Sequence, residues 1–315
     1  MTVLFWKELA DHLNSTRFII ILCLILSLAL LIGNSVSLNL ASILTEGGKT
    51  QFPFLRLFTT GGSFFSLLHF IALFGPLLAI VIGFDGINRE RNTGTLSLLL
   101  CQPIYRDSVI NSKFLAGMVT LGITFLSLTL LVSALGMIVV GVVPTFEEIA
   151  RLITFFIFLL IYLGLWLAIA QLFSIVFESP GTSALATLVT WITLTFMVGI
   201  LANLIASAAL PTRSKRDVIS KVRQLHLAEK LKMLSPVTLF TEAQAVLLDP
   251  GRRTSKKLII LDRSEKAAMR KFKSALPFSQ SLLVVTPYLT SLCAMSFVCF
   301  AASYILFMRQ DIRAL

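Results

Sequence analysis

Few residues of this chain have both the type and the spacing that chemistry needs. Gly48-Lys49-Thr50 matches the last three residues of a phosphate-binding loop, but that loop needs a glycine at position 43, where this chain has Ile43. His69 stands alone in an apolar run, which favours a hydrogen bond to a neighbouring helix over a functional role. The sequence contains no HExxH motif, no nucleophile elbow and no His, Cys, Asp or Glu group with metal-site spacing. We therefore predict a chain that is not an enzyme and that binds no cofactor or metal itself.

The cysteines give no sign of a disulfide framework or of redox chemistry. Three of the four lie inside apolar runs, and no two have the spacing of a metal site. Their positions are Cys23, Cys101, Cys293 and Cys299. We expect inert thiols that behave as small apolar side chains.

Ionisable residues are scarce in the long apolar runs. We expect no Lys or Arg inside them, and we place Asp85 and Glu178 at their ends. Proton-driven transporters and membrane enzymes need ionisable or catalytic groups at membrane depth. Both classes are therefore disfavoured, including an enzyme that modifies lipids. Because no part of the chain supplies energy, any work that the protein performs must draw its energy from a partner.

The polar stretch 84–113 has the pattern of a structured loop between two apolar runs. Charged residues occupy 89–91, an Asn-Thr-Gly-Thr break follows at 92–95, and Leu96 begins a short apolar helix that Pro103 ends. Leucines on a short helix outside the bilayer must be buried. They can pack on the protein's own helix ends, lie in the membrane interface or enter a groove on another protein. The residues by themselves leave these three alternatives open.

Composition places the chain among membrane proteins that cross the bilayer several times. Of its 315 residues, 56% are hydrophobic and 14% are charged, against about a quarter charged in soluble proteins. Several apolar runs are long enough to cross a hydrocarbon core of about 30 Å. We expect spans at about 18–40, 64–87, 109–141, 150–176, 182–209 and 279–308. The predicted fold is an all-α membrane protein with six transmembrane helices, the first of them uncleaved.

Residues 3–15 have the pattern of a short amphipathic helix before the first span. Trp6, Leu9 and Leu13 fall on one face, and Lys7 and Glu8 fall on others. A helix of this kind lies at the level of the lipid headgroups, with its aromatic residue as an anchor. We therefore predict an interfacial helix in which Trp6 contacts membrane lipids.

The largest polar region is 210–278, between the fifth and sixth spans. It holds 16 Lys and Arg against 6 Asp and Glu, a net charge of +10, while the whole chain has +11. Ser235-Pro236 predicts the start of a helix over 237–248. We expect three parts: 1–209 with a cytoplasmic coupling loop at 88–112, a basic, mostly helical extracytoplasmic subdomain at 210–278, and 279–315 with the last span and a cytoplasmic tail.

The basic region is a candidate contact for an anionic partner outside the membrane. Lipid headgroups, a cell-wall polymer or an acidic protein would suit its charge, whereas no nucleic acid is expected. The candidate contact residues are Arg252, Arg253, Lys256 and Lys257. A charged, solvated surface without a specific partner fits the sequence equally well.

The distribution of Lys and Arg orients the chain in the membrane. Six spans put both termini on one side, and the short segments on that side carry eight Lys and Arg, against three on the other. Positive residues in short loops mark the cytoplasm, whereas loops as long as 210–278 cross largely regardless of charge. We predict that both termini and the loop 88–112 are cytoplasmic. An odd number of spans is the alternative.

The central loop resembles the signature of ABC-2-type transporter permeases. The matching run is Glu90-Arg91-x-x-Gly94-Thr95-Leu96-x-x-Leu99-Leu100-x-x-Pro103-x-x-Arg106, followed by Lys113 and Ala116. It is similar to the subgroup that includes the permease of nitrous-oxide reductase maturation. The N-terminal helix, the six spans and the long loop before the last span agree as well, so the likeness covers most of the chain. The enlarged basic region 210–278 departs from the family, so no substrate carries over.

The resemblance implies the membrane-spanning subunit of an ATP-driven exporter in the plasma membrane of a prokaryote. It would pair with a second permease copy, as a homodimer or a heterodimer, beside two cytoplasmic subunits that bind ATP and Mg²⁺. The segment 94–103 would be a coupling helix seated in a groove of the ATPase. Leu96, Leu99 and Leu100 would anchor that contact, and Glu90 and Arg91 would fix its orientation.

A mechanical transmitter is the alternative function. It would use the same ATPase but move no solute. Instead it would pass the conformational change to an extracytoplasmic partner that the region 210–278 holds.

Overall fold

The structure is a computed structural model that describes residues 2–45, 52–59, 66–95, 105–209, 218–249 and 277–309. Its elements are α1 (Thr2–Leu13), α2 (Thr16–Thr45), α3 (Pro53–Thr59), α4 (Leu67–Gly83), α5 (Asn88–Asn92), α7 (Arg106–Val140), α8 (Phe146–Val176), α9 (Pro180–Ile192), the π-helical turn η1 (Thr193–Met197), α10 (Val198–Ala209), α11 (Val218–Lys232), α12 (Pro236–Leu248) and α14 (Phe278–Arg309). All of these elements are helical, so the predicted all-α fold is confirmed.

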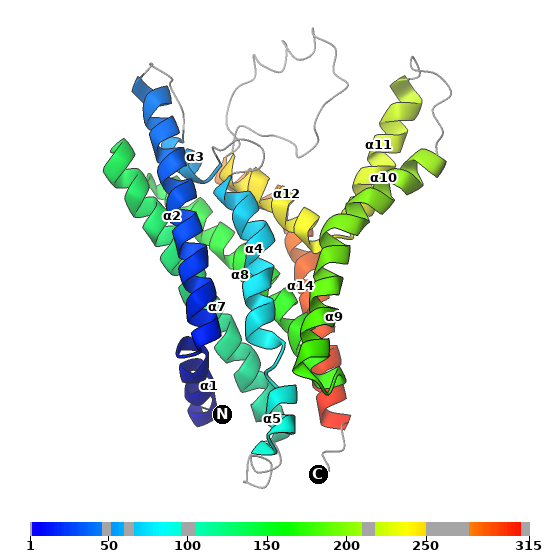
Figure 1. Cartoon of the computed structure of the whole chain (residues 1–315). Coiled ribbons are helices and arrows are strands. Elements are labelled where there is room, and N and C mark those ends of the chain that lie inside the picture. The colour runs from blue at the N-terminus through cyan, green and yellow to red at the C-terminus, as the bar shows by residue number, and fades with distance from the viewer. Residues whose placement is uncertain are drawn as a thin grey trace.

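Within the described residues, six helical segments are long and apolar enough to cross a membrane, and they match the six predicted spans. α2, α7, α8 and α14 are single helices, the second span runs from α4 into α5, and the fifth combines α9, η1 and α10. Figure 1 shows α1, α5 and the last turn of α14 at one end of the bundle, with α3 toward the other. The expectation that the spans hold no Lys or Arg is wrong, because Lys113 lies in α7 and Arg151 in α8, 8% and 0% exposed.

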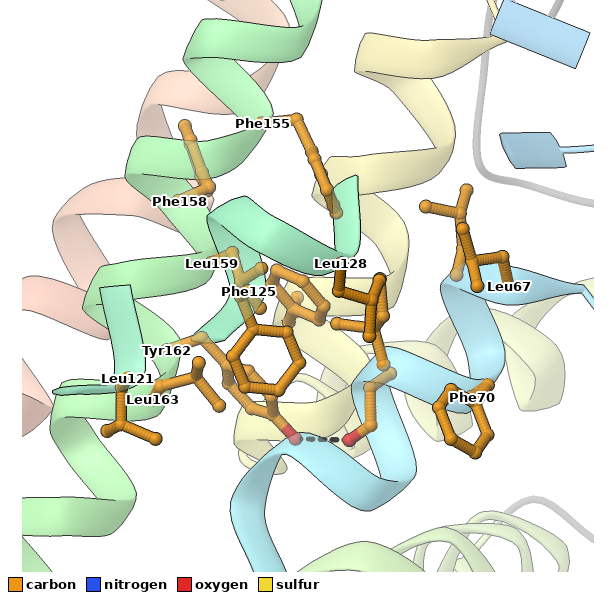
Figure 2. Close-up of a cluster of buried hydrophobic side chains, with 14 of the residues drawn as sticks. Leu67, Phe70, Leu121, Phe125, Leu128, Phe155, Phe158, Leu159, Tyr162 and Leu163 are labelled. Atoms are coloured by element: carbon orange, nitrogen blue, oxygen red, sulfur yellow. Dashed lines mark hydrogen bonds between the residues drawn. The ribbon is translucent and has the colours of Figure 1, made fainter. Parts of the chain in front are cut away.

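α8 forms the centre of the bundle because its middle is apolar on every side. Residues 162–170 are all buried, and α8 contacts α4, α7, α9, α12 and α14. Figure 2 shows Phe155, Leu159 and Tyr162 of α8 in the same cluster as Phe125 and Leu128 of α7. α4 is also largely buried, with only His69 exposed among its residues, whereas α2 packs on α7 and α4.

A proline in α4 is matched by a tyrosine in α8. Pro76 lies inside the helix and has no N–H to donate to the carbonyl four residues earlier, that of Ala72. The buried Tyr162 hydroxyl donates to this carbonyl oxygen at 2.7 Å, as the dashed line in Figure 2 shows. The proline therefore leaves no unpaired polar group in the core at Ala72.

α12 belongs to the basic region by sequence, yet it packs inside the bundle. The predicted helix over 237–248 is confirmed, with Ser235 as the N-cap residue. Phe240 is fully buried and stacks on Tyr162, with ring centroids 4.4 Å apart and nearly parallel planes. α12 also contacts α4, α8 and α14. In Figure 1 it runs obliquely between α4 and the fifth span, so this part of 210–278 joins the apolar core.

The fifth span changes direction at its π-helical turn. A π turn interrupts the regular hydrogen-bond ladder and is a common cause of a kink. Beyond η1, α10 leans away from the bundle in Figure 1. The hydroxyl of Ser235, which is 1% exposed at the start of α12, donates to the carbonyl oxygen of Leu194 at 2.6 Å. The inserted region thus pins the point at which the span bends.

Candidate functional site

The amphipathic helix α1 contacts the base of α7 through one face and leaves the other outward. Leu4, Glu8 and Leu9 are buried, and they belong to the face that meets the bundle. Val3 and Trp6 are 83% and 66% exposed on the opposite side. Apolar residues that face outward beside the first span suit a helix lying in the membrane interface. The contact of Trp6 with lipid stays a prediction. The expectation that Leu9 shares a face with Trp6 is wrong, because Leu9 is buried against the bundle.

The loop after α4 is tied to α8 before it reaches the central motif. The backbone N–H groups of Ile87 and Asn88 both donate to the hydroxyl of Ser174, at 3.0 and 3.3 Å. The side-chain amide of Asn92 donates to the carbonyl oxygen of Glu178 at 3.1 Å. These bonds fix α5 against the inner end of α8, so the loop has a defined path up to the break that follows.

The break occurs at Gly94, where the backbone takes a left-handed conformation with φ of +72°. This conformation is one that glycine adopts readily and other residues avoid. A Cβ atom at Gly94 would meet nothing within 4 Å, so the requirement for glycine comes from the backbone and not from crowding. The predicted break after the charged residues is thus present, whereas the leucine helix expected beyond it lies outside the described residues.

Two lysines and two glutamates meet where α1, α5 and α7 converge, and we call them the inner charge cluster: Lys7, Glu8, Glu90 and Lys113. The ammonium group of Lys113 lies 3.0 Å from Glu8 Oε2 and 2.8 Å from Glu90 Oε1. Lys7 lies farther off, 3.6 Å from Glu8 Oε1 and 3.8 Å from Glu90 Oε1. Lys113 and Glu8 are each 7% exposed at their side chains. One buried cation therefore joins the N-terminal helix, the central loop and the third span.

A small cavity of about 20 Å³ lies beside the inner charge cluster. Its lining includes Glu8, His12, Lys113 and Gln171. Glu8 Oε1 and Gln171 Oε1 are buried and accept no hydrogen bond from the described residues. The cavity has room for about one water molecule. Burial lowers the pKa of His12 below its usual value near 6.5, although the Glu8 carboxylate acts in the opposite direction.

Four polar residues at the other end of α8 form what we call the outer polar network: Thr145, Glu147, Glu148 and Arg151. Glu148 and Arg151 are fully buried, whereas the Glu147 side chain is 40% exposed. Thr145 and Glu148 form a capping box at the start of α8. Glu148 Oε1 accepts from the backbone N–H of Phe54, at 3.0 Å, where the N-terminus of α3 favours an anion. The fully buried Glu148 therefore holds α3 against α8.

Arg151 completes the outer polar network. Its Nη1 donates to the carbonyl oxygen of Leu247 at 3.0 Å and to the hydroxyl of Ser281 at 3.2 Å. Its Nε and Nη2 both donate to Glu147 Oε1, at 3.1 and 2.8 Å. The guanidinium also lies over the rings of Phe52 and Phe278. One arginine thus connects the last turn of α12 and the first turn of α14 to α8.

Only some of the predicted coupling residues lie in the described part of the chain. Glu90 is in the inner charge cluster. Arg91, which follows it directly, and Arg106, at the start of α7, are half-buried. Gly94 and Thr95 follow α5, and the Thr95 hydroxyl donates to the Glu90 carbonyl oxygen at 3.3 Å. The remaining predicted residues lie outside the described part of the chain: Leu96, Leu99, Leu100 and Pro103 of the loop, and Arg252, Arg253, Lys256 and Lys257 of the basic region.

Sequence reasoning missed the outer polar network, although a signal for it was present. Thr145 stands three residues before Glu148, which is the spacing of a capping box ahead of an apolar helix. Lys113 was recognised only as the lysine that opens the third span. That it pairs with Glu8, which is 105 positions earlier in the chain, has no local signal.

Nearly the whole chain is similar to a known family of membrane proteins. A family model described as ABC-2 family transporter protein matches residues 2–312. No curated protein matches the chain at a significant level. The family match does not confirm the closer likeness to the permeases of nitrous-oxide reductase maturation. Because it covers nearly the whole chain, which also has six apolar spans, the protein belongs to the ABC-2 transporter family as a membrane-spanning permease subunit.

Proposed function

We propose that this permease subunit receives ATP-driven movement at the junction of α1, α5 and α7 and passes it to the spans, which export or extrude a substrate. The observation that carries the proposal is the position of Lys113, buried between Glu8 and Glu90. An ATP-binding subunit in the cytoplasm would hold the ATP and Mg²⁺.

The geometry of the junction supports this direction of force. The described part of the loop ends at Thr95, directly before the leucines that we expect to contact the ATPase. A displacement there would reach Glu90 within five residues and Lys113 through the ion pair at 2.8 Å. Lys113 pairs with both carboxylates, so the same cation links the loop to α7 and α1. The push would therefore move α7 and α1 together.

The proposed orientation puts this junction in the cytoplasm. α1, α5 and the last turn of α14 share one end of the bundle, and the short segments there carry most of the Lys and Arg outside 210–278. We propose a prokaryotic plasma membrane with both termini inside. The basic residues of 210–278, Arg252 and Lys256 among them, would then face outward, toward an anionic surface or partner.

Co-purification and ATPase measurements test the proposal. We expect an ATP-binding protein to co-purify with the wild-type chain and to be lost when Leu96 and Leu99 are both changed to Asp. Lys113→Met should keep that protein bound but lower its ATPase activity in liposomes, because the contact remains while its connection to α7 is cut. Lys113→Arg is the matched control, since it keeps the cation.

The outcomes separate the proposal from its rivals. Unchanged co-purification after the double Asp substitution would contradict coupling through the loop. An unchanged ATPase activity in Lys113→Met would show that the force bypasses the junction. A chain that lacks only residues 251–275, and so keeps α12 in the core, separates the two functions. If it keeps the coupled ATPase but loses an extracytoplasmic binding partner, the mechanical transmitter is favoured over the exporter.

A further inference from the structure

α10 and α11 form a helical hairpin at the edge of the bundle. In the described part of the chain, α11 packs extensively on α10 alone, and α10 packs on α11 and η1. Ala202 and Ala206 of α10 are 2% and 0% exposed, and Ala228 of α11 is 4% exposed. These small residues make the contact between the two helices, because small side chains let helices approach closely. The opposite face of α11 is left to whatever surrounds the protein.

That outward face of α11 carries a line of basic side chains. Arg223, His226 and Lys230 are all exposed, and their spacing of three and four residues puts them on one side of the helix. The one acidic residue of α11, Glu229, is half-buried. No carboxylate of the described residues forms an ion pair with Arg223 or Lys230. The positive charge of this face is therefore not neutralised within the described chain.

A hydrogen bond fixes the depth from which α11 rises. The hydroxyl of Ser235, just after α11, donates to the carbonyl oxygen of Leu194 at 2.6 Å. The fifth span begins at Pro180 at the inner end of the bundle, and Leu194 lies about 21 Å farther along the helix at 1.5 Å per residue. Because the hydrocarbon core is about 30 Å thick, this bond lies inside the core, in its outer part. Figure 1 shows α11 rising from α12 toward the outer end.

The position of each exposed residue along α11 gives its depth in the membrane. Met233 and Leu234, directly before Ser235, are 40% and 68% exposed and lie among the acyl chains. Lys230 and Arg223 lie about 7 and 18 Å above Ser235 along the helix, and about 9 Å of the core remains there. Lys230 can therefore extend its ammonium group to the lipid headgroups, and Arg223 lies at or just beyond their level.

We propose that the basic face of α11 binds the headgroups of anionic phospholipids in the outer leaflet. The guanidinium and the ammonium would donate charge-assisted hydrogen bonds to phosphate oxygens, while Met233 and Leu234 contact the acyl chains. A soluble anionic partner would need the charge but not the apolar residues below it, so the combination favours lipid. The inference goes beyond the proposed coupling function and rests on the proposed orientation only for the choice of leaflet.

Native mass spectrometry of the purified full chain tests the lipid contact. Offered equal amounts of phosphatidylglycerol and phosphatidylcholine with the same acyl chains, the wild type should retain phosphatidylglycerol preferentially. Lys230→Gln should lower this preference roughly fivefold, which corresponds to about 1 kcal/mol for one cation at an anionic surface. Adding Arg223→Gln should lower it further by a similar factor, whereas Lys230→Arg should preserve it.

A matched control lies two residues away on the same helix. Lys232 is half-buried and about 200° around the helix from Lys230, so Lys232→Gln removes the same charge and should leave the preference unchanged. Equal losses in Lys230→Gln and Lys232→Gln would show that overall charge attracts the lipid, and that result would overturn the proposal. So would an unchanged preference in the Arg223→Gln, Lys230→Gln double variant. Binding of dextran sulfate instead of phosphatidylglycerol through these residues would identify a soluble anionic partner and reject the lipid.

A second measurement tests the depth of α11. In a cysteine-free chain reconstituted into vesicles of the two lipids, a nitroxide on Leu234→Cys should collide with oxygen more often than with a water-soluble nickel chelate. A nitroxide on Arg223→Cys should show the opposite preference. The reverse order would place α11 outside the membrane and contradict the proposal. Neither measurement needs the ATP-binding subunit, so failure of the lipid contact leaves the coupling proposal standing. Absence of a co-purifying ATP-binding protein would reject coupling and leave the lipid contact standing.

Discussion

The two ends of the bundle differ in how completely their buried charged groups are paired. Each buries a cation beside carboxylates, Lys113 at the inner end and Arg151 at the outer end. In the outer polar network both oxygens of Glu148 accept hydrogen bonds, and Nε, Nη1 and Nη2 of Arg151 all donate. In the inner charge cluster Glu8 Oε1 and Glu90 Oε2 accept none from the described residues, and a cavity lies alongside. We call the outer polar network the anchor, because its hydrogen-bonding groups are paired. We call the inner charge cluster the joint, because it has unpaired oxygens and a cavity beside it.

The largest effect should come from breaking the anchor. Arg151→Met would leave the Leu247 carbonyl without its donor and would open the contacts among α8, α12 and α14. Arg151 donates to two buried acceptors, and each buried polar group that is left unpaired costs about 1–3 kcal/mol, so thermal unfolding in detergent should shift strongly downward. Arg151→Lys should fall between, because an ammonium cannot donate in so many directions. An unchanged unfolding temperature in Arg151→Met would remove the distinction between anchor and joint.

Breaking the joint should cost the whole fold less. We expect Lys113→Met to lower the free energy of unfolding by about 1–3 kcal/mol, since water can reach the carboxylates through the cavity and Lys7 stays close. The main consequence should be local, with α1 released from α7. Labelling of Leu4→Cys, a site 6% exposed in the wild type, should become faster in a cysteine-free chain. Should Lys113→Met destabilise the protein as much as Arg151→Met, the two clusters would be equivalent.

A glycine-to-alanine substitution can introduce the same backbone strain at either end of the bundle. Gly94 and Gly141 share a φ of +72°, and neither has crowding around its missing Cβ. Alanine at either position should cost about 1–2 kcal/mol of local strain. Only Gly94→Ala should reduce ATPase binding or stimulation, because Gly141 lies at the far end of α7. Equal loss in both variants would point to general misfolding rather than to the coupling loop.

The smallest effect should be a pH dependence confined to the joint. Burial lowers the pKa of His12 below 6.5, while Glu8, Asp85 and Asp11 act to raise it and Lys113 acts to lower it further. The released helix therefore binds a proton at a higher pH than the docked helix does. Docking of α1 should be strongest above pH 6.5 and should weaken as the pH falls toward the docked-state pKa. Labelling of Leu4→Cys across this range measures it, and His12→Gln should flatten the profile.

Much of the inner end could be predicted from the sequence. The break at 92–95 and the N-terminal helix have local patterns, because turn chemistry and helical period act over a few residues. The partners of Lys113 could not be foreseen, since the pairing with Glu8 depends on how α1 returns to α7. The burial of α12 was also missed. Its apolar helix was recognised, but the net charge of the surrounding region suggested a separate unit outside the membrane.

The spans were predicted well because their length and hydropathy are set by the bilayer. What hydropathy does not show is which polar residues the spans bury. Arg151 stands five residues into α8 and reaches a carbonyl on α12 and a hydroxyl on α14, contacts between segments distant in sequence. An arginine near a span end looks like an interfacial residue until those partners are placed beside it.

The bond between Tyr162 and the Ala72 carbonyl gives Pro76 a mutational partner. In Pro76→Ala the new N–H would donate to the Ala72 carbonyl oxygen. This oxygen would then be paired even without the Tyr162 hydroxyl. Tyr162→Phe should therefore be harmful beside a proline and nearly tolerated beside an alanine. The two positions form a thermodynamic pair across two helices, so substitutions at either one have a cost that depends on the residue at the other.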